Sequence, residues 1–514
     1  MTPDSISSAL EQFLGESHGA IVRENGAELF DLAQSKYSVT GEHNRCLLHL
    51  WSAERNVVRR IVDMEVKGDV LRLAVQRLGQ SAPAKLEICR FRDLRTPSEK
   101  RVSRLAYRHK LNRILERHFA GFIVAELRTS ADLERSFGPV YCRGLLHRGQ
   151  SAFAVFGVND KETQSSIDAA LTFAILWLDH CRRNQAGKRV VEGLKLFLPS
   201  GTTTLTRQRV SHLNANAAQW QMYEFNERED SLAQVDLADQ GNFSTRLVHL
   251  ADKVHAHQRF AEAITRIRRW MPEAEVVVLS PALIAFRHHG LEFARVRPAQ
   301  GSSAFDNTIG IVFGLGRSEQ TLTAANESAL VKLIHSIGEV RHPQGPRDHR
   351  LWRAYPERWL ESLVAGNIGL LDETLESAPA YSQVPAFSAA DRAMIDVLAL
   401  TRSGRLTVVE LKADEDIHLP LQGVDYWSRV AWHHARGEFK RFGYFPGREL
   451  SGAKPRLILT APALHIHPAT DTLLRYISPE IDWMLAGIDE HWREQVKVVF
   501  RKRPLPQTAI KYAC

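Results

Sequence analysis

The order of apolar and polar residues predicts a chain of successive folded regions. In the first 95 residues, short apolar runs separated by glycine and polar residues predict an antiparallel sheet, with strands at 46–51, 57–62 and 70–75. From residue 96 the pattern becomes mixed: helices at 104–118 and 167–181, and strands at 140–146, 153–158 and 190–198. Helices alternating with strands are typical of an α/β layer. We therefore predict a basic β-rich module at 1–95 and an α/β domain at 96–240.

A comparable series follows. It comprises a helix at 247–270, strands at 276–279, 283–286 and 293–296, and a helix at 322–337. The segment 341–350 combines two prolines, a glycine and several charges, which predicts a linker. We place an α/β region at 241–344 and a last domain at 345–514. The expected fold class is α/β (α+β), multidomain.

One local pattern occurs three times: an apolar run, a short turn containing glycine, and a second apolar run, at 144–156, 283–296 and 395–411. Hairpins with a glycine are common, so ordinary hairpins explain the repetition. The alternative is that the chain carries diverged copies of one α/β unit, of which only the last retains chemistry. In that alternative 96–240 is a degenerate copy of this unit.

Composition narrows the class of protein. The chain has 514 residues, 44% of them hydrophobic, and a net charge of +8, which excludes wholesale disorder and fibrous classes. The apolar runs are too short for a membrane span, and residues 1–4 lack the features of a secretory signal, so we expect a cytoplasmic protein with no membrane partner. Five cysteines without a Cys-x-x-Cys pair argue against a zinc ribbon or a disulfide framework.

The last domain contains a hairpin with charged residues at unusual positions. Apolar runs at 391–400 and 406–412 flank a turn that contains Gly404. A three-residue loop with Gly404 in the left-handed conformation would pair Thr401 with Arg405 and place Asp396 opposite Glu410. Lys412, two residues further along, would share that face. A two-residue turn would instead send Asp396 to the other face.

Two carboxylates and a lysine in otherwise apolar strands are poorly suited to a core. Like charges repel unless a cation lies between them, and hard oxygen ligands suit Mg²⁺ or Mn²⁺. Such a metal can hold a phosphate oxygen and lower the pKa of a bound water, and Lys412 can orient that water. The pattern therefore predicts phosphodiester hydrolysis. The alternative is a surface hairpin whose Glu410 and Lys412 lie in a solvated row.

At Ala393-Met394-Ile395-Asp396 and Val409-Glu410-Leu411-Lys412 the chain resembles the PD-(D/E)xK, or restriction-endonuclease-like, superfamily. It is most similar to the branch of prokaryotic mismatch-cleaving endonucleases, whose strands read Gly-Arg-Ile-Asp and Val-Glu-Leu-Lys, so that Ala393 replaces a glycine. The resemblance covers about 352–443. It implies an αβββαβ core, a metal bound by Asp396, Glu410 and the carbonyl of Leu411, and a catalytic Lys412.

The same branch has a glutamine followed four residues later by a tyrosine on the next helix, and Gln422 and Tyr426 match that pair. The resemblance implies that Gln422 supports the site on the phosphate side and that Tyr426 packs the helix. Glu361 fits the position of the glutamate on the first helix.

Basic residues suggest where nucleic acid would bind. They recur along the helix expected at 104–118, as Arg104, Arg108 and Lys110, and Arg429 lies in an aromatic and basic stretch after the hairpin. A phosphate-tracking face and an ordinary solvated or packing face are both open. Lys412 would contact the scissile phosphate itself.

These features together predict a Mg²⁺-dependent (or Mn²⁺-dependent) endonuclease acting on double- or single-stranded DNA. The N-terminal regions would then serve nucleic-acid binding, substrate selection or dimerisation, with a homodimer left open. Two alternatives stay open: a catalytically silent nucleic-acid-binding or assembly protein, and an RNA-directed or nucleotide-activated nuclease effector.

Overall fold

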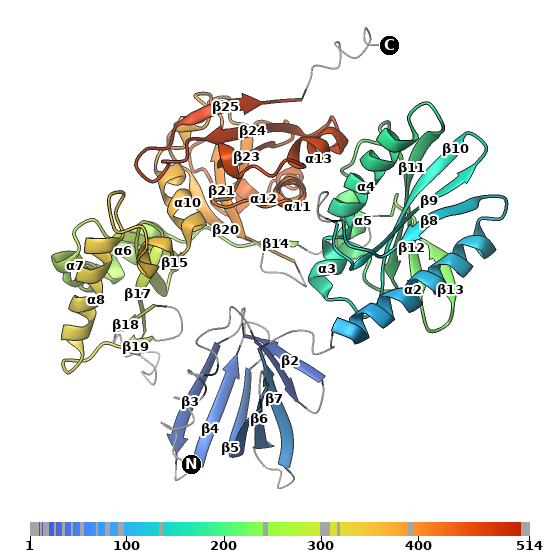
Figure 1. The fold of residues 1–514 in the computed structure, drawn as a ribbon. Helices are drawn as coiled ribbons and strands as arrows, with labels where there is room; N and C mark the ends of the chain where they lie inside the picture. Colours follow the sequence, from blue (N-terminus) through green and yellow to red (C-terminus); the bar gives the residue numbers. More distant parts are fainter. Residues whose placement is uncertain are drawn as a thin grey trace. The chain divides into compact units, whose positions relative to one another are not determined.

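The computed structural model describes two parts of the chain that separate as compact units, Met1–Ser103 and Arg104–Cys514 (Figure 1). The described residues are 10, 13, 20–24, 27–32, 36–42, 45–51, 56–67, 70–77, 83–90, 97–132, 137–239, 245–298, 309–315, 319–388 and 394–504. The chain contains several β-sheets together with helices, which confirms the α/β (α+β) multidomain class. Among the described residues, no helix combines the length and apolar character needed to cross a membrane.

The first unit contains a seven-stranded antiparallel sheet with the order β2-β1-β7-β6-β5-β4-β3. Its strands are β1 (Ile21–Glu24), β2 (Ala27–Asp31), β3 (Lys36–Glu42), β4 (Arg45–Trp51), β5 (Asn56–Lys67), β6 (Val70–Arg77) and β7 (Pro83–Cys89). Leu71, Leu73 and Val75 alternate toward the buried side of β6, whereas Val62 and Val66 of β5 are half exposed. The strands expected at 46–51, 57–62 and 70–75 are confirmed.

The middle region is a six-stranded sheet, β13-β12-β11-β10-β9-β8, with helices on both faces. Its elements are α2 (Pro97–His118), β8 (Ile123–Arg128), β9 (Tyr141–Arg148), β10 (Ser151–Val158), α3 (Gln164–Asp168), α4 (Ala170–Gln185), β11 (Val190–Pro199), α5 (Thr204–Val210), β12 (Gln219–Asn226) and β13 (Ser231–Gln234). Tyr107, Leu111 and Ile114 of α2 are buried in one core, and α4 is buried in the other. The α/β layer expected here is confirmed.

The next region is an antiparallel five-stranded sheet in sequence order, covered by helices that share its core. Its elements are α6 (Lys253–Arg259), α7 (Ala261–Trp270), β15 (Glu275–Ser280), β16 (Leu283–His288), β17 (Leu291–Pro298), β18 (Ile309–Phe313), β19 (Gln320–Thr321) and α8 (Glu327–Val340). The single helix predicted at 247–270 is wrong. Residues 245–247 form β14 (Thr245–Leu247) instead, and the Asp252 carboxylate caps a new helix start by accepting a hydrogen bond from the His255 amide.

The segment 341–350, expected to be a linker, is anchored in the fold. Arg341 is fully buried, and its guanidinium donates hydrogen bonds to the carbonyls of His288, His289, Leu351 and Ala354. A buried arginine is tolerated only when its donors are satisfied, and four carbonyls achieve this here. The sequence showed the charge and the prolines but not these partners.

The last region is a seven-stranded mixed sheet with the order β14-β20-β21-β22-β23-β24-β25. Its elements are α9 (Arg350–Arg353), α10 (Pro356–Gly366), β20 (Tyr381–Ser388), β21 (Met394–Leu400), β22 (Leu406–Leu411), α11 (Leu419–Ala435), α12 (Glu438–Arg441), β23 (Arg456–Pro462), α13 (Thr470–Tyr476), β24 (Asp482–Ile488) and β25 (Val498–Lys502). β14 is therefore paired with β20 in this sheet, although 241–344 was expected to be a separate region. The boundaries between the four predicted domains otherwise stay predictions.

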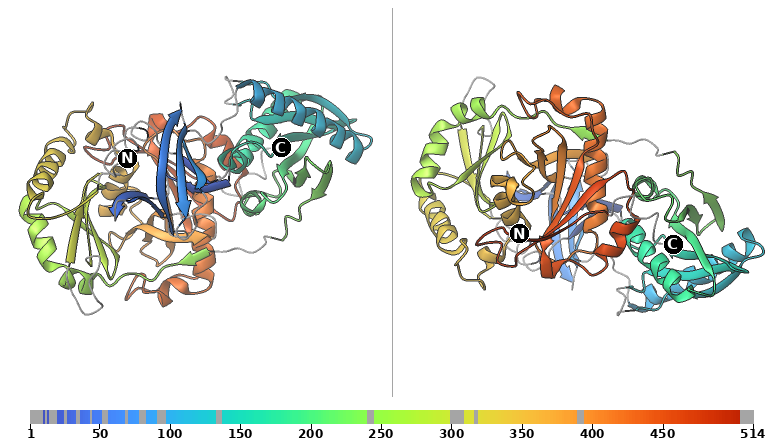
Figure 2. Two further views of the ribbon diagram at one scale, coloured as in Figure 1. Left: turned by 90° about the horizontal axis from the view of Figure 1, so that it is seen from below. Right: turned by 90° about the horizontal axis from the view of Figure 1, so that it is seen from above.

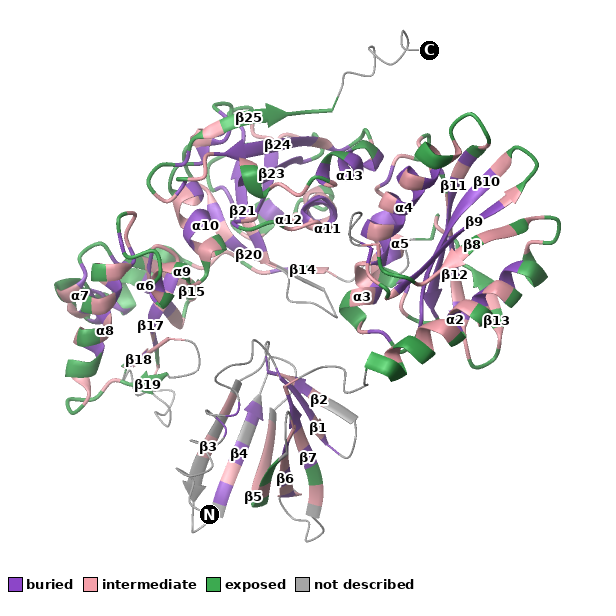
Figure 3. Cartoon of the chain, viewed as in Figure 1, coloured by how far each residue is buried: buried purple, intermediate pink, exposed green. Residues whose placement is uncertain are grey.

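Two cores sandwich this last sheet (Figures 1 and 2). Trp359 and Leu360 of α10 are buried in one core, and Val424 and Trp427 of α11 are buried in the other. β22, β23 and β24 are parallel and almost entirely buried, as expected of strands that helices cover on both faces (Figure 3). The order α10, β20, β21, β22, α11, β23 is an αβββαβ succession, and its assignment to the nuclease core stays a prediction.

Candidate functional site

The hairpin of β21 and β22 has the predicted register. Val397 pairs with Val409, and the Thr401 amide donates to the Arg405 carbonyl at 2.9 Å. Gly404 has φ +78°, the left-handed conformation that a three-residue loop needs, and a Cβ there would lie 2.2 Å from the Glu449 carbonyl oxygen. One step beyond the Val397–Val409 pair, this register places Asp396 opposite Glu410.

The two carboxyl groups of this pair lie close together, with Glu410 buried and Asp396 half-buried. Asp396 Oδ2 accepts a hydrogen bond from the Leu411 amide at 2.9 Å, and Glu410 is 2% exposed. Burial, followed by the nearby Asp396 charge, raises the pKa of Glu410 far above its usual value. Burial also raises the pKa of Asp396, against the opposing effects of the Leu411 amide and Lys412. Two neighbouring like charges, one of them buried, favour a shared proton or a bound cation.

Lys412 lies among these acids. Its Nζ is 3.2 Å from Glu410 Oε1, 3.8 Å from Glu357 Oε1 and 4.0 Å from Asp416 Oδ2. Burial alone would lower the pKa of Lys412, but the surrounding carboxylates, Glu410 first, raise it above its usual value. Lys412 therefore carries a charge at neutral pH, in a position where its side chain is only 14% exposed.

The helix α10 and the strand β20 complete one side of the site. Glu361 Oε2 accepts hydrogen bonds from Gln383 Nε2 at 2.5 Å and from Arg358 at 3.0 Å. β20 pairs Ser382 with Val397 and Val384 with Ile395, so Gln383 lies opposite Asp396 in the register. Gln383 has φ +55°, a strained conformation for a residue other than glycine.

Gln383 and Arg358 were not among the residues predicted for the site. No strand was named for the segment between α10 and the hairpin, which is rich in proline and serine, whereas the structure has strand β20 there. β20 becomes a strand because it can pair with β21 on one side and with β14 on the other. The pairing with β21 is short-range, since Pro385 pairs with Met394, whereas β14 lies far from β20 in the sequence and a local pattern does not predict that pairing.

We expect Glu361 to make the stability of the metal-free protein pH-dependent. Burial raises the pKa of Glu361 to about 8, only partly opposed by Arg358. The folded protein thus holds this proton more tightly than the unfolded chain, so its contribution is full below the ordinary value of 4.5 and is lost as the pH rises toward 8. The slope is at most about 1.4 kcal/mol per pH unit.

Urea unfolding of the wild type and Glu361→Gln between pH 5 and pH 8, without divalent metal, measures this slope. Because glutamine does not ionise, we expect the variant to lose less stability than the wild type over that range. Parallel stability curves for the two proteins would contradict the assignment.

The oxygen atoms around Asp396 and Glu410 are candidate ligands for a metal ion. Among the described residues, no three or more His, Cys, Asp or Glu side chains converge as a ready metal cage. However, Glu410 Oε2 and Gln422 Oε1 are both buried polar atoms without a hydrogen-bond partner in the described part of the chain. Buried oxygens of this kind call for a hydrogen-bond donor or a cation. Asp396 and Glu410, with one main-chain carbonyl, therefore fit a hard divalent ion.

The other residues named on α11 are placed as follows. Gln422 is half-buried, and Tyr426 packs, partly buried, against the core under α11, as the resemblance implied for a helix-packing residue. Arg429 is 7% exposed, with its guanidinium carbon 5.9 Å from the centre of the Tyr426 ring. This burial turns Arg429 away from solvent, so nothing in the structure supports a phosphate contact there.

Two of the three basic residues predicted to bind DNA on α2, Arg104 and Lys110, lie beside glutamates. Arg104 is paired through two nitrogens with Glu162, at 2.7 and 3.2 Å. Lys110 donates to the Glu227 carbonyl at 2.8 Å, and Arg108 is half-buried beside His109. Arg104 and Lys110 thus have acidic neighbours within the fold, and DNA binding by Arg104, Arg108 and Lys110 stays a prediction.

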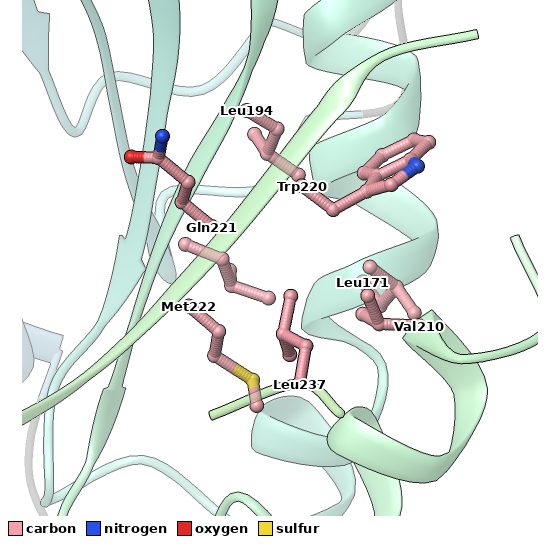
Figure 4. Close-up of a pocket in the computed structure, with 8 residues that line it drawn as sticks. Leu171, Leu194, Val210, Trp220, Gln221, Met222 and Leu237 are labelled. Atoms are coloured by element: carbon pink, nitrogen blue, oxygen red, sulfur yellow. The ribbon is translucent and has the colours of Figure 1, made fainter. Parts of the chain in front are cut away.

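A small gap between α4 and the strands β11 and β12 is no second ligand site. It is lined mainly by apolar side chains, among them Leu171, Leu194 and Met222 (Figure 4), and leaves no room for a water molecule. Such gaps are ordinary packing defects.

Comparison with known proteins adds no relative. No protein-family model matches the chain, and no curated protein matches it. Ala393, which replaces the glycine of the resembling branch, lies outside the described residues.

Proposed function

We propose that residues 345–514 form a metal-dependent endonuclease that hydrolyses phosphodiester bonds in DNA. The observation that carries the proposal is the pair Asp396 and Glu410, held opposite each other in buried strands with Lys412 Nζ 3.2 Å from Glu410. A buried pair of carboxylates destabilises a fold unless something compensates for it. A bound divalent cation would compensate for this repulsion and would also support phosphodiester hydrolysis.

Asp396 and Glu410, with the carbonyl of Leu411, would hold Mg²⁺ or Mn²⁺. When bound, the ion neutralises charge on a scissile phosphate and acidifies a water molecule. Lys412 is charged and constrained by three carboxylates, so its ammonium can orient the attacking water and contact the phosphate. Glu361, fixed by Arg358 and Gln383, supports the same side of the site.

The two alternatives differ in what they need from this site. A catalytically silent binding protein would gain nothing from keeping two neighbouring like charges, one of them buried, which favours the enzyme. An RNA-directed or nucleotide-activated nuclease would use the same carboxylates and lysine, because phosphodiester chemistry is common to DNA and RNA. These residues would therefore serve DNA and RNA alike, and cleavage of the two substrates distinguishes the two possibilities.

The test is a cleavage assay with the full-length protein on plasmid, linear duplex, single-stranded DNA and RNA. We expect cleavage of DNA with Mg²⁺ or Mn²⁺ and none with chelator. Cleavage of RNA alone would replace DNA by RNA as the substrate. Inactivity on every substrate with both metals, or cleavage that chelator leaves unchanged, would refute the proposal.

A further inference from the structure

The middle region and the last region share one topology. The middle region runs α2-β8-β9-β10-α4-β11-α5-β12-β13, and the last runs α10-β20-β21-β22-α11-β23-α13-β24-β25. In both, the first three strands are antiparallel, the next two pairings are parallel, and the final pairing is antiparallel. The third glycine hairpin, at 283–296, belongs to an antiparallel meander and is not a copy.

The strand registers align the two regions residue by residue. Pro199 is the last residue of β11, and Pro462 is the last residue of β23. When these two prolines are aligned, the pairing of each strand with the next strand also aligns the first residue of β12 with the first residue of β24. Phe156 pairs with Leu196 of β11, as Glu410 pairs with Leu459 of β23. Phe156 therefore occupies the position of Glu410.

The middle region lacks the acids of the site. Arg143 pairs with Phe156 across the hairpin and so occupies the position of Asp396, and Val158 occupies that of Lys412. Arg143 is 1% exposed, and its guanidinium donates to the carbonyls of Ser130 and Gly138. A buried arginine with a phenylalanine opposite cannot hold a divalent cation, so the site is lost in this copy.

Helices from the two regions pack against each other in a reciprocal way. α4 contacts α13, and α5 contacts α11. Since α4 corresponds to α11 and α5 to α13, each contact is the counterpart of the other, as a two-fold axis requires. Two ion pairs join the regions in the same reciprocal way. Arg209 of α5 lies 2.7 Å from Asp425 of α11, and Arg475 of α13 lies 3.4 Å from Asp179 of α4. Each arginine is the sixth residue of its helix.

The centre of this contact is an antiparallel bridge between the segments that follow α5 and α13. Leu213 bridges Ile477, the Asn214 amide donates to the Tyr476 carbonyl at 2.8 Å, and the Ser478 amide donates to the His212 carbonyl at 2.9 Å. Leu421, Leu473 and Tyr476 are buried in the core of the middle region. An apolar centre with satisfied backbone groups is characteristic of a permanent interface.

We propose that the chain is a dimer built into one polypeptide, in which the middle region occupies the place of a second nuclease subunit and one chain cuts one strand of a duplex. The one-strand product rests on the proposed function. A symmetric nuclease dimer presents two sites to the two strands, which are related by the dyad of the DNA. Here the surface that would bind a second copy is covered by the middle region, and only one side carries Asp396, Glu410 and Lys412.

The first test is the product formed from supercoiled plasmid with Mg²⁺. We expect open circles as the first product, with linear DNA appearing only after them, and an initial rate proportional to protein concentration. Linear DNA as the first product, or a rate that rises with the square of the concentration, would overturn the proposal. Uncleaved plasmid would refute the one-strand product, whereas the nuclease itself is refuted only when linear duplex, single-stranded DNA and RNA are uncleaved as well. In either case the built-in dimer is decided by the second test.

The second test is independent of activity. Sedimentation equilibrium should give the mass of one chain, 58.1 kDa, and a stable two-chain species would overturn the built-in dimer. In unfolding experiments Arg209→Glu and Asp425→Arg should each lower the midpoint by several degrees, because each leaves a half-buried charge beside a like charge. The combined swap should recover most of that loss. Equal midpoints for all four proteins would show that the two regions do not pack together.

Discussion

Lys412→Met is expected to abolish DNA cleavage. The Lys412 ammonium is the cation nearest the buried Glu410 carboxylate, at 3.2 Å, and it also lies 3.8 Å from Glu357. Methionine keeps the length and apolar stem of the side chain but removes the charge and the protons. Loss of a group that positions the nucleophile and transfers protons lowers the rate about 10²–10⁴-fold, measured as single-turnover cleavage at saturating Mg²⁺.

Two matched variants separate chemistry from folding. Lys412→Arg keeps a positive charge among the acids but replaces a compact ammonium by a planar guanidinium, so we expect the folded protein to persist and cleavage to remain strongly reduced. Lys454→Met removes a lysine paired with Glu480 on an exposed surface and should leave cleavage unchanged. Wild-type cleavage by Lys412→Met would remove Lys412 from the mechanism.

Asp396→Asn is expected to change activity and stability in opposite directions. Asparagine keeps an oxygen that can accept the hydrogen bond from the Leu411 amide but removes one of the two neighbouring like charges. Cleavage should fall at least about 100-fold, because a metal-ligand charge is lost. Without divalent metal, the variant should be more stable than the wild type by about 1 kcal/mol or more at pH 8, because the repulsion with Glu410 is relieved.

Asp372→Asn is the matched contrast within the same domain. Although burial acts to raise it, hydrogen bonds from Thr374 and Arg456 hold the pKa of Asp372 at about 2, so this carboxylate stabilises the fold. Its substitution should therefore destabilise the protein, as measured by urea unfolding under the same conditions. If Asp396→Asn were destabilising in the same way, Asp396 would be a structural residue.

The hairpin was predictable because its determinants are local. A glycine at the left-handed position of a short loop sets the register, and the register decides that Asp396 faces Glu410. The alternation of helices and strands likewise indicated the α/β class. Alternative loop lengths would have put the same residues on opposite faces, so one turn glycine carried most of the information.

The missing parts of the site depend on contacts between distant segments. Gln383 reaches Glu361 only because β20 joins the sheet beside β21, and the pairing of β14 with β20 spans more than a hundred residues. Arg429 is a further example: its charge suggested a surface role, whereas helix α11 turns it toward the protein. Side-chain burial on a long amphipathic helix follows from tertiary packing, not from charge.

The repeated hairpin pattern was informative only in part. Gly149 and Gly404 lie in the turns of corresponding hairpins and both have positive φ, although the first turn has two residues and the second has three. Gly290 shares that conformation but serves a different need, since a Cβ there would lie 2.1 Å from the Arg358 carbonyl oxygen. The same short local pattern thus occurs in the two regions that share a sheet topology and in a third region that does not, and only the sheet order separates them.

The central claim is that Asp396 and Glu410 hold one divalent cation. Electron paramagnetic resonance of Mn²⁺ titrated into the full-length protein with duplex DNA measures this most directly, with Asp396→Asn/Glu410→Gln as the comparison. We predict one Mn²⁺ bound by the wild type in excess of the double variant, displaced by Mg²⁺. Equal binding by the two proteins, or no binding by the wild type, would contradict the claim.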